Sequence, residues 1–209
     1  MKRVITPELL DSLPADDPGA MRSRRDLQRI NAFMGNMSWI LKHLPVQPCS
    51  ISELGAGDGR FVHRLSCEYP KVDVWAYDLQ PKPAHVAERI QWVKGNALKQ
   101  TIPGQGGVLI ANLILHHFSD KQLNELGTFV CGFDVLIINE PRRARLPLWL
   151  SRLATPSVND ITRHDMQVSV EAGFIEGEMP ELLGISQQEY KIHESSTWRG
   201  SQRMLAYRR

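Results

Sequence analysis

The sequence predicts a doubly wound α/β fold with a mostly parallel, Rossmann-like sheet. Seven short runs rich in β-branched and aromatic residues begin at position 50, and helical patterns lie between several of them. This alternation indicates βαβ units, in which helices cover both faces of a parallel sheet. A glycine-rich segment, 55–59, follows the first of these runs. In such a sheet that position lies at the carboxyl ends of the strands, where ligands bind.

The segment before the sheet has two parts. Residues 1–21 contain several Pro, Asp and Gly residues and are predicted to be an irregular lead-in. Residues 22–44 carry apolar side chains at spacings of three and four, which predicts one amphipathic helix that ends before Pro45. We expect residues 49–209 to form the core of a single domain spanning 1–209, since its length suits one hydrophobic core.

The core is predicted to alternate as follows. Strands are expected at 50–54, 72–77, 90–93, 108–115, 133–138, 190–195 and 203–207, which makes seven. Helices are expected at 58–68, 120–128, 146–153 and 163–172. Thr162 is the expected N-cap of the last helix, and Gly173 ends it. The final two strands form a C-terminal hairpin, which places an antiparallel strand near the edge of the sheet.

Composition excludes several classes of protein. The chain has 25 Lys and Arg against 23 Asp and Glu, and a net charge of +2 argues against a dedicated nucleic-acid binder. Its three cysteines form no C-x-x-C pair, which argues against a disulfide framework or structural zinc and favours a reducing, cytoplasmic setting. We expect no membrane span, because the longest apolar stretch, 108–115, is far too short. No feature predicts an oligomeric state.

The glycine segment indicates the kind of ligand. A dinucleotide-binding loop needs G-x-G-x-x-G, but Gly55, Gly57 and Gly59 place the third glycine one residue early. Glu53, two residues before the first glycine, would repel a pyrophosphate and would attract a cationic amine. The loop therefore favours a ligand with a positively charged amino-acid end.

This loop resembles motif I of the class I S-adenosylmethionine-dependent methyltransferases. Asp78, at the end of the second strand, is placed like the family's ribose-binding acid, while Asn96 stands where the family usually has an acid near adenine. The resemblance covers about residues 50–209 and implies S-adenosyl-L-methionine as the cofactor. The cofactor-binding residues that it implies are Glu53, Gly55, Ala56, Gly57, Gly59, Asp78, Leu79, Asn96, Ala97 and Asn112.

The likeness extends to particular methyltransferases. The segment Asn112-Leu-Ile-Leu-His-His-Phe118 resembles ubiquinone-biosynthesis-type methyltransferases. Segments at 23–36, 139–143 and 161–165 resemble bacterial methyltransferases associated with polyketide biosynthesis. These resemblances imply a small, apolar, oxygen-bearing acceptor. They also imply that residues 20–44 and 142–165 act as lids over the acceptor, with the N-terminal helix as the principal lid.

Three histidines are candidate catalytic residues for transfer to a hydroxyl. A general base would help to deprotonate the acceptor, and histidine titrates in the right range. His117 and His116 follow the fourth strand at the edge where cofactor and acceptor should meet, and His164 lies near a predicted helix start. The sequence lacks the paired aspartates with an adjacent asparagine that metal-dependent catechol-type methyltransferases use. We therefore expect no catalytic metal.

Two alternatives stay open. The chain could bind S-adenosylmethionine or S-adenosylhomocysteine without catalysis, since no histidine is an indisputable base. It could also methylate a nucleic acid, although the fourth strand does not end in the Asn/Asp-Pro-Pro-aromatic segment typical of such enzymes. The arginine cluster Arg142, Arg143 and Arg145 is interpreted as a solvated helix start.

Overall fold

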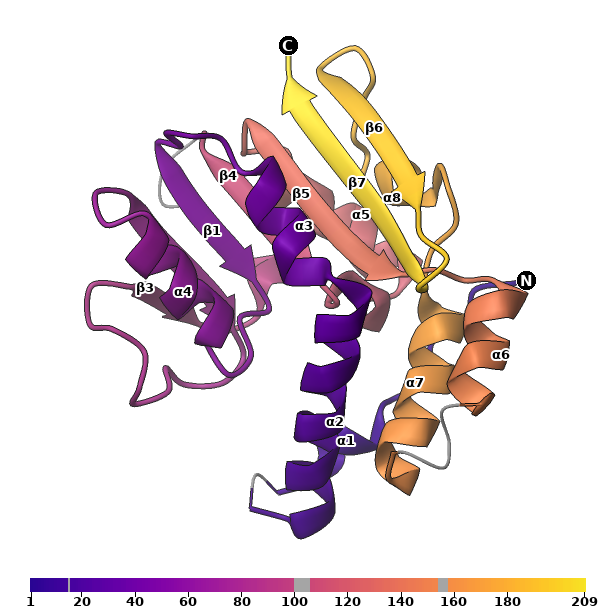
Figure 1. The fold of residues 1–209 in the computed structure, drawn as a ribbon. Helices are drawn as coiled ribbons and strands as arrows, with labels where there is room; N and C mark the ends of the chain where they lie inside the picture. Colours follow the sequence, from indigo (N-terminus) through magenta and orange to yellow (C-terminus); the bar gives the residue numbers. More distant parts are fainter. Residues whose placement is uncertain (15, 100–105, 154–157) are drawn as a thin grey trace.

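A seven-stranded sheet forms the centre of the computed structural model, which describes residues 1–14, 16–99, 106–153 and 158–209 (Figure 1). The strand order is β3-β2-β1-β4-β5-β7-β6. Strands β1 to β5 pair in parallel, and β7 runs antiparallel to both β5 and β6. The strands are β1 (Ser50–Leu54), β2 (Asp73–Asp78), β3 (Gln91–Lys94), β4 (Val108–Asn112), β5 (Val135–Pro141), β6 (Tyr190–Ser196) and β7 (Ser201–Arg208). The predicted fold class is confirmed.

Helices cover both faces of this sheet and its carboxyl edge. They are α1 (Leu9–Ser12), α2 (Pro18–Met34), α3 (Asn36–His43), α4 (Arg60–Glu68), α5 (Asp120–Val130), α6 (Arg145–Leu153), α7 (Asp160–Ala172) and α8 (Glu178–Leu182), with 3-10 turns η1 (Ala97–Lys99) and η2 (Leu115–His117). Figure 1 shows α1, α2, α6 and α7 gathered beyond the ends of the strands, where β1 and β5 point. The ligand-binding edge of the sheet is therefore covered by helices from the N-terminal segment and from the segment that follows β5.

Burial of both faces of the sheet explains why the strand sequences are continuous apolar runs. In β4, Val108 and Ile110 pack on the face covered by α3 and α4, whereas Leu109 and Ala111 pack on the face covered by α5 and α8. Because both faces are buried, neither set of alternate positions can be polar. The strand ends where this requirement stops, at Asn112.

The N-terminal part departs from the predicted boundaries. The predicted helix at 22–44 is wrong as one element: it is two helices, broken at Gly35, whose φ of 70° lies in the left-handed region. Helix α2 also begins earlier than expected, because the Asp17 side chain caps it by accepting from the N–H of Ala20, and Pro18 occupies its first turn. The predicted irregular lead-in, 1–21, contains α1 and this first turn.

Three further expectations need correction. Asn159, not Thr162, caps α7: its side chain accepts from the N–H of Thr162, so the helix begins three residues sooner. The strand predicted to reach residue 115 stops at Asn112, because Leu113 has a φ of 58°. Arg143 is 4% exposed rather than solvated, since it binds the carbonyls of Met1 and Gly173. Within the predicted lid segment 142–165, residues 154–157 lie outside the described residues.

Candidate active site

The glycine loop is tied to the neighbouring strand by its own backbone. The N–H of Gly57 donates to Oδ2 of Asp78 at 2.7 Å, and the N–H of Gly55 donates to the carbonyl of Tyr77 at 2.8 Å. All three loop glycines have φ between 54° and 72°, a region that residues with a Cβ rarely adopt. The loop therefore lies at the carboxyl edge, between β1 and β2.

The glycines have different surroundings. A Cβ at Gly55 would lie 2.5 Å from Ile114, and one at Gly59 would lie 2.4 Å from Val86, so both glycines allow close packing. A Cβ at Gly57 would meet no atom within 4 Å. The space over Gly57 is thus open, which gives a ligand access to the backbone beside Asp78.

Glu53 is a buried carboxylate with one oxygen that has no hydrogen-bond partner. That atom is Oε2, and the residue is 4% exposed. Burial raises its pKa well above the usual value, and the carboxylates of Asp58 and Asp78 raise it further. A buried charge is costly unless it is paired. An ammonium group bound beside it would supply that pair, so Glu53 fits the amino-acid end of S-adenosylmethionine.

The remaining cofactor residues from the sequence lie along the same edge. Asn96 and Ala97 follow β3, and Asn112 ends β4, where its Oδ1 accepts from Asn139. Ala56 and Ala97 are buried, whereas Leu79 is 67% exposed. This edge carries the Glu53 and Asp78 carboxylates and the open space over Gly57, and it fits a ligand with an amino group, a ribose and a base. The assignment of these residues to such a ligand stays a prediction.

A second cluster begins at η2, directly after β4. Glu140, at the end of β5, is fully buried and accepts from the backbone N–H groups of Ile114 and Leu115 at 2.9 and 2.8 Å. Its other oxygen, Oε2, lies 2.8 Å from Nδ1 of His116. One carboxylate therefore fixes both the turn and the first histidine ring. No pattern in the sequence predicted this role for Glu140.

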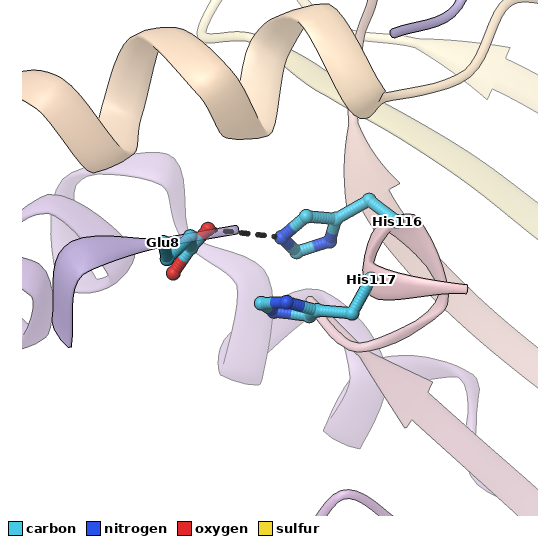
Figure 2. Close-up of side chains that lie close together, drawn as sticks. All are labelled: Glu8, His116 and His117. Atoms are coloured by element: carbon cyan, nitrogen blue, oxygen red, sulfur yellow. Dashed lines mark ion pairs between the residues drawn. The ribbon is translucent and has the colours of Figure 1, made fainter. Parts of the chain in front are cut away.

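The other nitrogen of His116 faces the N-terminal segment. Its Nε2 lies 3.5 Å from Oε1 of Glu8, and Figure 2 shows this carboxylate directed at the ring. Burial alone would lower the pKa of His116, but the carboxylates of Glu140 and Glu8 outweigh burial and raise this pKa to about 9. Burial raises the pKa of Glu8, but His116, His117 and Ser169 together outweigh burial, so this pKa lies below its usual value.

His117 stacks on His116 and lines a cavity. The two ring centroids lie 4.2 Å apart, and Nδ1 of His117 lies 3.7 Å from Oδ2 of Asp11. Burial lowers the pKa of His117, and the positive charge of His116 lowers it further. The cavity has a volume of about 350 Å³ and is lined by Ile5, Thr6, Pro7, Glu8, Asp11, His116, His117, Val168, Ser169 and Ala172.

The N-terminal segment, residues 1–12, is anchored at both ends. The Arg3 guanidinium donates to the carbonyls of Ala172 and Phe118, each at 2.9 Å. The buried carboxylate of Asp165 accepts from the N–H groups of Leu9 and Leu10 at 2.8 and 3.0 Å. These anchors hold Glu8 and Asp11 over η2. No local pattern in the sequence indicated this, because the partners are more than a hundred residues apart.

His164 is separate from this cluster. It lies on α7 with Nδ1 3.0 Å from Asp165, and its side chain is 41% exposed. The described residues that line the cavity do not include it. Of the three histidines predicted from the sequence, the structure brings together His116 and His117.

The strand order, the reversed strand β7, the glycine loop and the acid ending β2 define a class I S-adenosylmethionine-dependent methyltransferase. A family model for the O-methyltransferase domain matches residues 23–130, and the chain belongs to that family. It is therefore an enzyme whose cofactor is S-adenosyl-L-methionine. Within the described residues, no helix has the length and apolar character needed to cross a membrane.

Solved structures share this fold. The plantazolicin methyltransferase BpumL, in complex with a triazolic desmethylPZN analog and SAH, is 11% identical, with 92% of each chain covered and a TM-score of 0.69. Human N-acetylserotonin methyltransferase in complex with SAM is 16% identical, with a TM-score of 0.61; the match covers 95% of this chain and 61% of that one. An O-methyltransferase family protein from Burkholderia thailandensis is 18% identical over 93% and 61%, with a TM-score of 0.60. A comparison with curated proteins found no match.

Proposed function

We propose that this chain methylates a hydroxyl group of a small molecule that binds in the cavity beneath residues 1–12. The observation that supports this most directly is the path of residues 112–117. Ile114 packs against Gly55 of the glycine loop, while His116 and His117 line the cavity a few residues later. One short segment thus connects the cofactor loop with a cavity of suitable size for a small ligand.

The cofactor would be held by the residues along the carboxyl edge. Glu53 would pair with its amino group, Asp78 would accept from the ribose hydroxyls, Asn96 and Ala97 would contact adenine, and Asn112 would lie near the methionine end. S-Adenosylmethionine, when bound, supplies an electrophilic methyl group on a sulfonium sulfur. The chain contributes mainly position, which is worth up to about 7–11 kcal/mol for well-aligned reactants.

Within the cavity, His117 is the proposed general base. Both ring nitrogens of His116 face carboxylates, of Glu140 and of Glu8, so His116 has no lone pair free for an acceptor. His117 is half-buried and lines the cavity, and its Nδ1 lies 3.7 Å from Oδ2 of Asp11. It would take the proton of the acceptor hydroxyl, while His116 and Glu140 keep its ring in place through stacking. An acceptor with an apolar body would suit Ile5 and Val168, which also line the cavity.

The test is methyl transfer from labelled S-adenosylmethionine to a panel of phenols and other small hydroxylated compounds. We expect the variant His117→Ala to lose at least about 100-fold in turnover, the usual contribution of a general base, with unchanged cofactor affinity. His193→Ala, an exposed histidine on β6, is the matched control and should keep full activity. Cofactor binding without turnover over the whole panel would contradict the proposal, and transfer to RNA or DNA alone would assign another substrate class.

A further inference from the structure

The outward side of α2 carries a row of exposed arginines that ends at an exposed aromatic ring. The row consists of Arg22, Arg25, Arg29 and Phe33. Their spacings of three, four and four residues place them on one side of the helix, over about 16 Å of its length. The Arg29 side chain is 80% exposed, and Phe33 is 58% exposed. Arg22 and Arg25 also line a cavity of about 610 Å³ beside the start of α7.

Phe33 meets a second exposed ring, which comes from the other end of the chain. Trp198, in the turn between β6 and β7, is 60% exposed, and the two ring centroids lie 6.1 Å apart in an edge-to-face arrangement. The Arg199 guanidinium lies 5.2 Å from each ring centroid and donates to the carbonyl of Phe33 at 2.9 Å. In Figure 1 this turn lies close to the end of α2. Arg199 therefore holds the two rings in place although both are more than half exposed.

Other sides of α2 are already in contact with the protein. The side chain of Gln28 donates to Oδ2 of Asp58, beside the glycine loop, at 3.4 Å. On another side, the Thr162 hydroxyl on α7 donates to Oγ of Ser23 at 2.9 Å. The arginine row lies on a side of the helix that neither contact uses, so its charges stay available to a partner.

The acids near the row are engaged elsewhere or outnumbered. The Asp17 side chain caps α2, and Asp160 pairs with Arg163 at 2.6 Å. Asp26 is buried, with one oxygen 3.7 Å from Nη1 of Arg29. The exposed surface along the row therefore carries an excess of positive charge, which is complementary to an anionic partner.

We propose that the arginine row and the Phe33–Trp198 pair form a docking surface for an anionic lipid bilayer. Phospholipid headgroups present negative charge over a plane, and this suits cations that are spread along a helix. Aromatic rings beside cations are typical of segments that lie in the headgroup region. A headgroup phosphate would enter the cavity beside Arg22 and Arg25, while the two rings would insert between neighbouring headgroups.

The distribution of charge and rings favours a bilayer over a protein partner. A two-fold contact with a second copy would set this surface against itself, and arginine would then face arginine. An acidic protein would match the charge, but it would have to supply a fitted pocket for two rings at 85° to one another. The headgroup layer is fluid and accepts exposed rings in any arrangement.

Flotation of the full-length chain with lipid vesicles tests the proposal. We expect binding to vesicles of equal parts phosphatidylglycerol and phosphatidylcholine, at least about tenfold weaker binding to phosphatidylcholine alone, and weakening by added salt. The double variant Arg22→Gln, Arg25→Gln should weaken binding to anionic vesicles at least about tenfold. The matched control is Lys71→Gln, Lys121→Gln, which removes two exposed charges elsewhere and should bind as the wild type does.

The aromatic pair has its own readouts. Trp198→Ser should weaken vesicle binding at least about fivefold, whereas Val46→Ser, at a 90% exposed apolar position after α3, should not. Brominated phosphatidylcholine in anionic vesicles should quench tryptophan fluorescence more in the wild type than in Trp198→Phe, because only the wild type places this indole in the headgroup layer.

Several results would overturn the proposal. They are no wild-type binding to anionic vesicles, unchanged binding in both folded arginine and tryptophan variants, and tighter binding to polyglutamate or RNA than to these vesicles. A dimer that Trp198→Ser dissociates would assign the surface to a second copy instead. Vesicle binding requires neither cofactor nor acceptor, so this proposal and the proposed methyl transfer fail separately.

Discussion

The backbone N–H of Gly57 donates to Oδ2 of Asp78 at 2.7 Å, and this bond joins the glycine loop to the end of β2. Oδ1 of the same carboxylate accepts from the N–H of Gln80 at 2.8 Å. Each carboxylate oxygen keeps a further lone pair, so Asp78 can organise the loop and still accept from a ribose.

Asp78→Ala removes both functions. We expect the affinity for S-adenosylmethionine and S-adenosylhomocysteine to fall at least tenfold, about 1.4 kcal/mol. Calorimetric titration of the folded variant checks this. The matched control is Asp73→Ala, because this exposed carboxylate lies at the other end of the same strand. Equal affinity in wild type and Asp78→Ala would remove this carboxylate from the cofactor site.

The raised pKa of Glu53 predicts that cofactor binding releases a proton. Burial raises this pKa in the free enzyme, and an ammonium group beside the carboxylate would lower it. Between the two pKa values affinity therefore increases with pH, because the free carboxyl holds a proton that the complex loses. Calorimetry in buffers of different ionisation enthalpy measures the proton. Glu53→Gln should bind more weakly and release none; an enthalpy independent of buffer in the wild type would contradict the assignment.

Two glycine substitutions should separate stability from binding. Gly59→Ala adds a Cβ 2.4 Å from Val86 at a φ of 72°, and both overlap and backbone strain should lower the free energy of unfolding, by about 2–4 kcal/mol together. Gly57→Ala meets no neighbour, so it should cost only the strain, about 1–2 kcal/mol, while weakening cofactor binding. Urea unfolding and titration measure both quantities. Equal losses of stability would contradict the difference in packing.

Glu140→Gln should destabilise the fold. The substitution keeps the volume but places an amide NH₂ against donors that now bond to a buried carboxylate. Loss of one member of a buried charged pair usually costs about 3–5 kcal/mol. Glu125→Gln, on the exposed side of α5, is the control and should stay within about 0.5 kcal/mol of the wild type. A Glu140→Gln stability equal to that control would show that the turn holds without the charge.

Asp165→Asn should loosen the N-terminal segment. Its carboxylate accepts from two backbone N–H groups, of Leu9 and Leu10, and an amide can accept from only one side. We expect hydrogen exchange in residues 1–12 to accelerate about tenfold, which corresponds to about 1.4 kcal/mol. Asp160→Asn, an exposed position on the same helix, should leave the exchange unchanged. Unaltered exchange in Asp165→Asn would show that Arg3 alone suffices as an anchor.

Local patterns in the sequence predicted the sheet and its glycine loop well, because buried parallel strands require continuous apolar runs. The same patterns could not place Glu8, whose role depends on contacts with residues more than a hundred positions away. They also missed the break at Gly35, since the apolar spacing continues across it while only the backbone turns. Glu140 could have been suspected from its position: it ends the strand beside β4, so its side chain had to lie near the histidines.

The anchoring of residues 1–12 also determines when the cavity can first exist during synthesis. Arg3 binds Phe118 and Ala172, and Asp165 binds Leu9, so the cavity has no wall until the ribosome has released α7. Residues 1–12 therefore wait for partners that are synthesised some 160 residues later. A fragment that ends before α7 would keep the whole glycine loop but would lack one wall of the acceptor cavity.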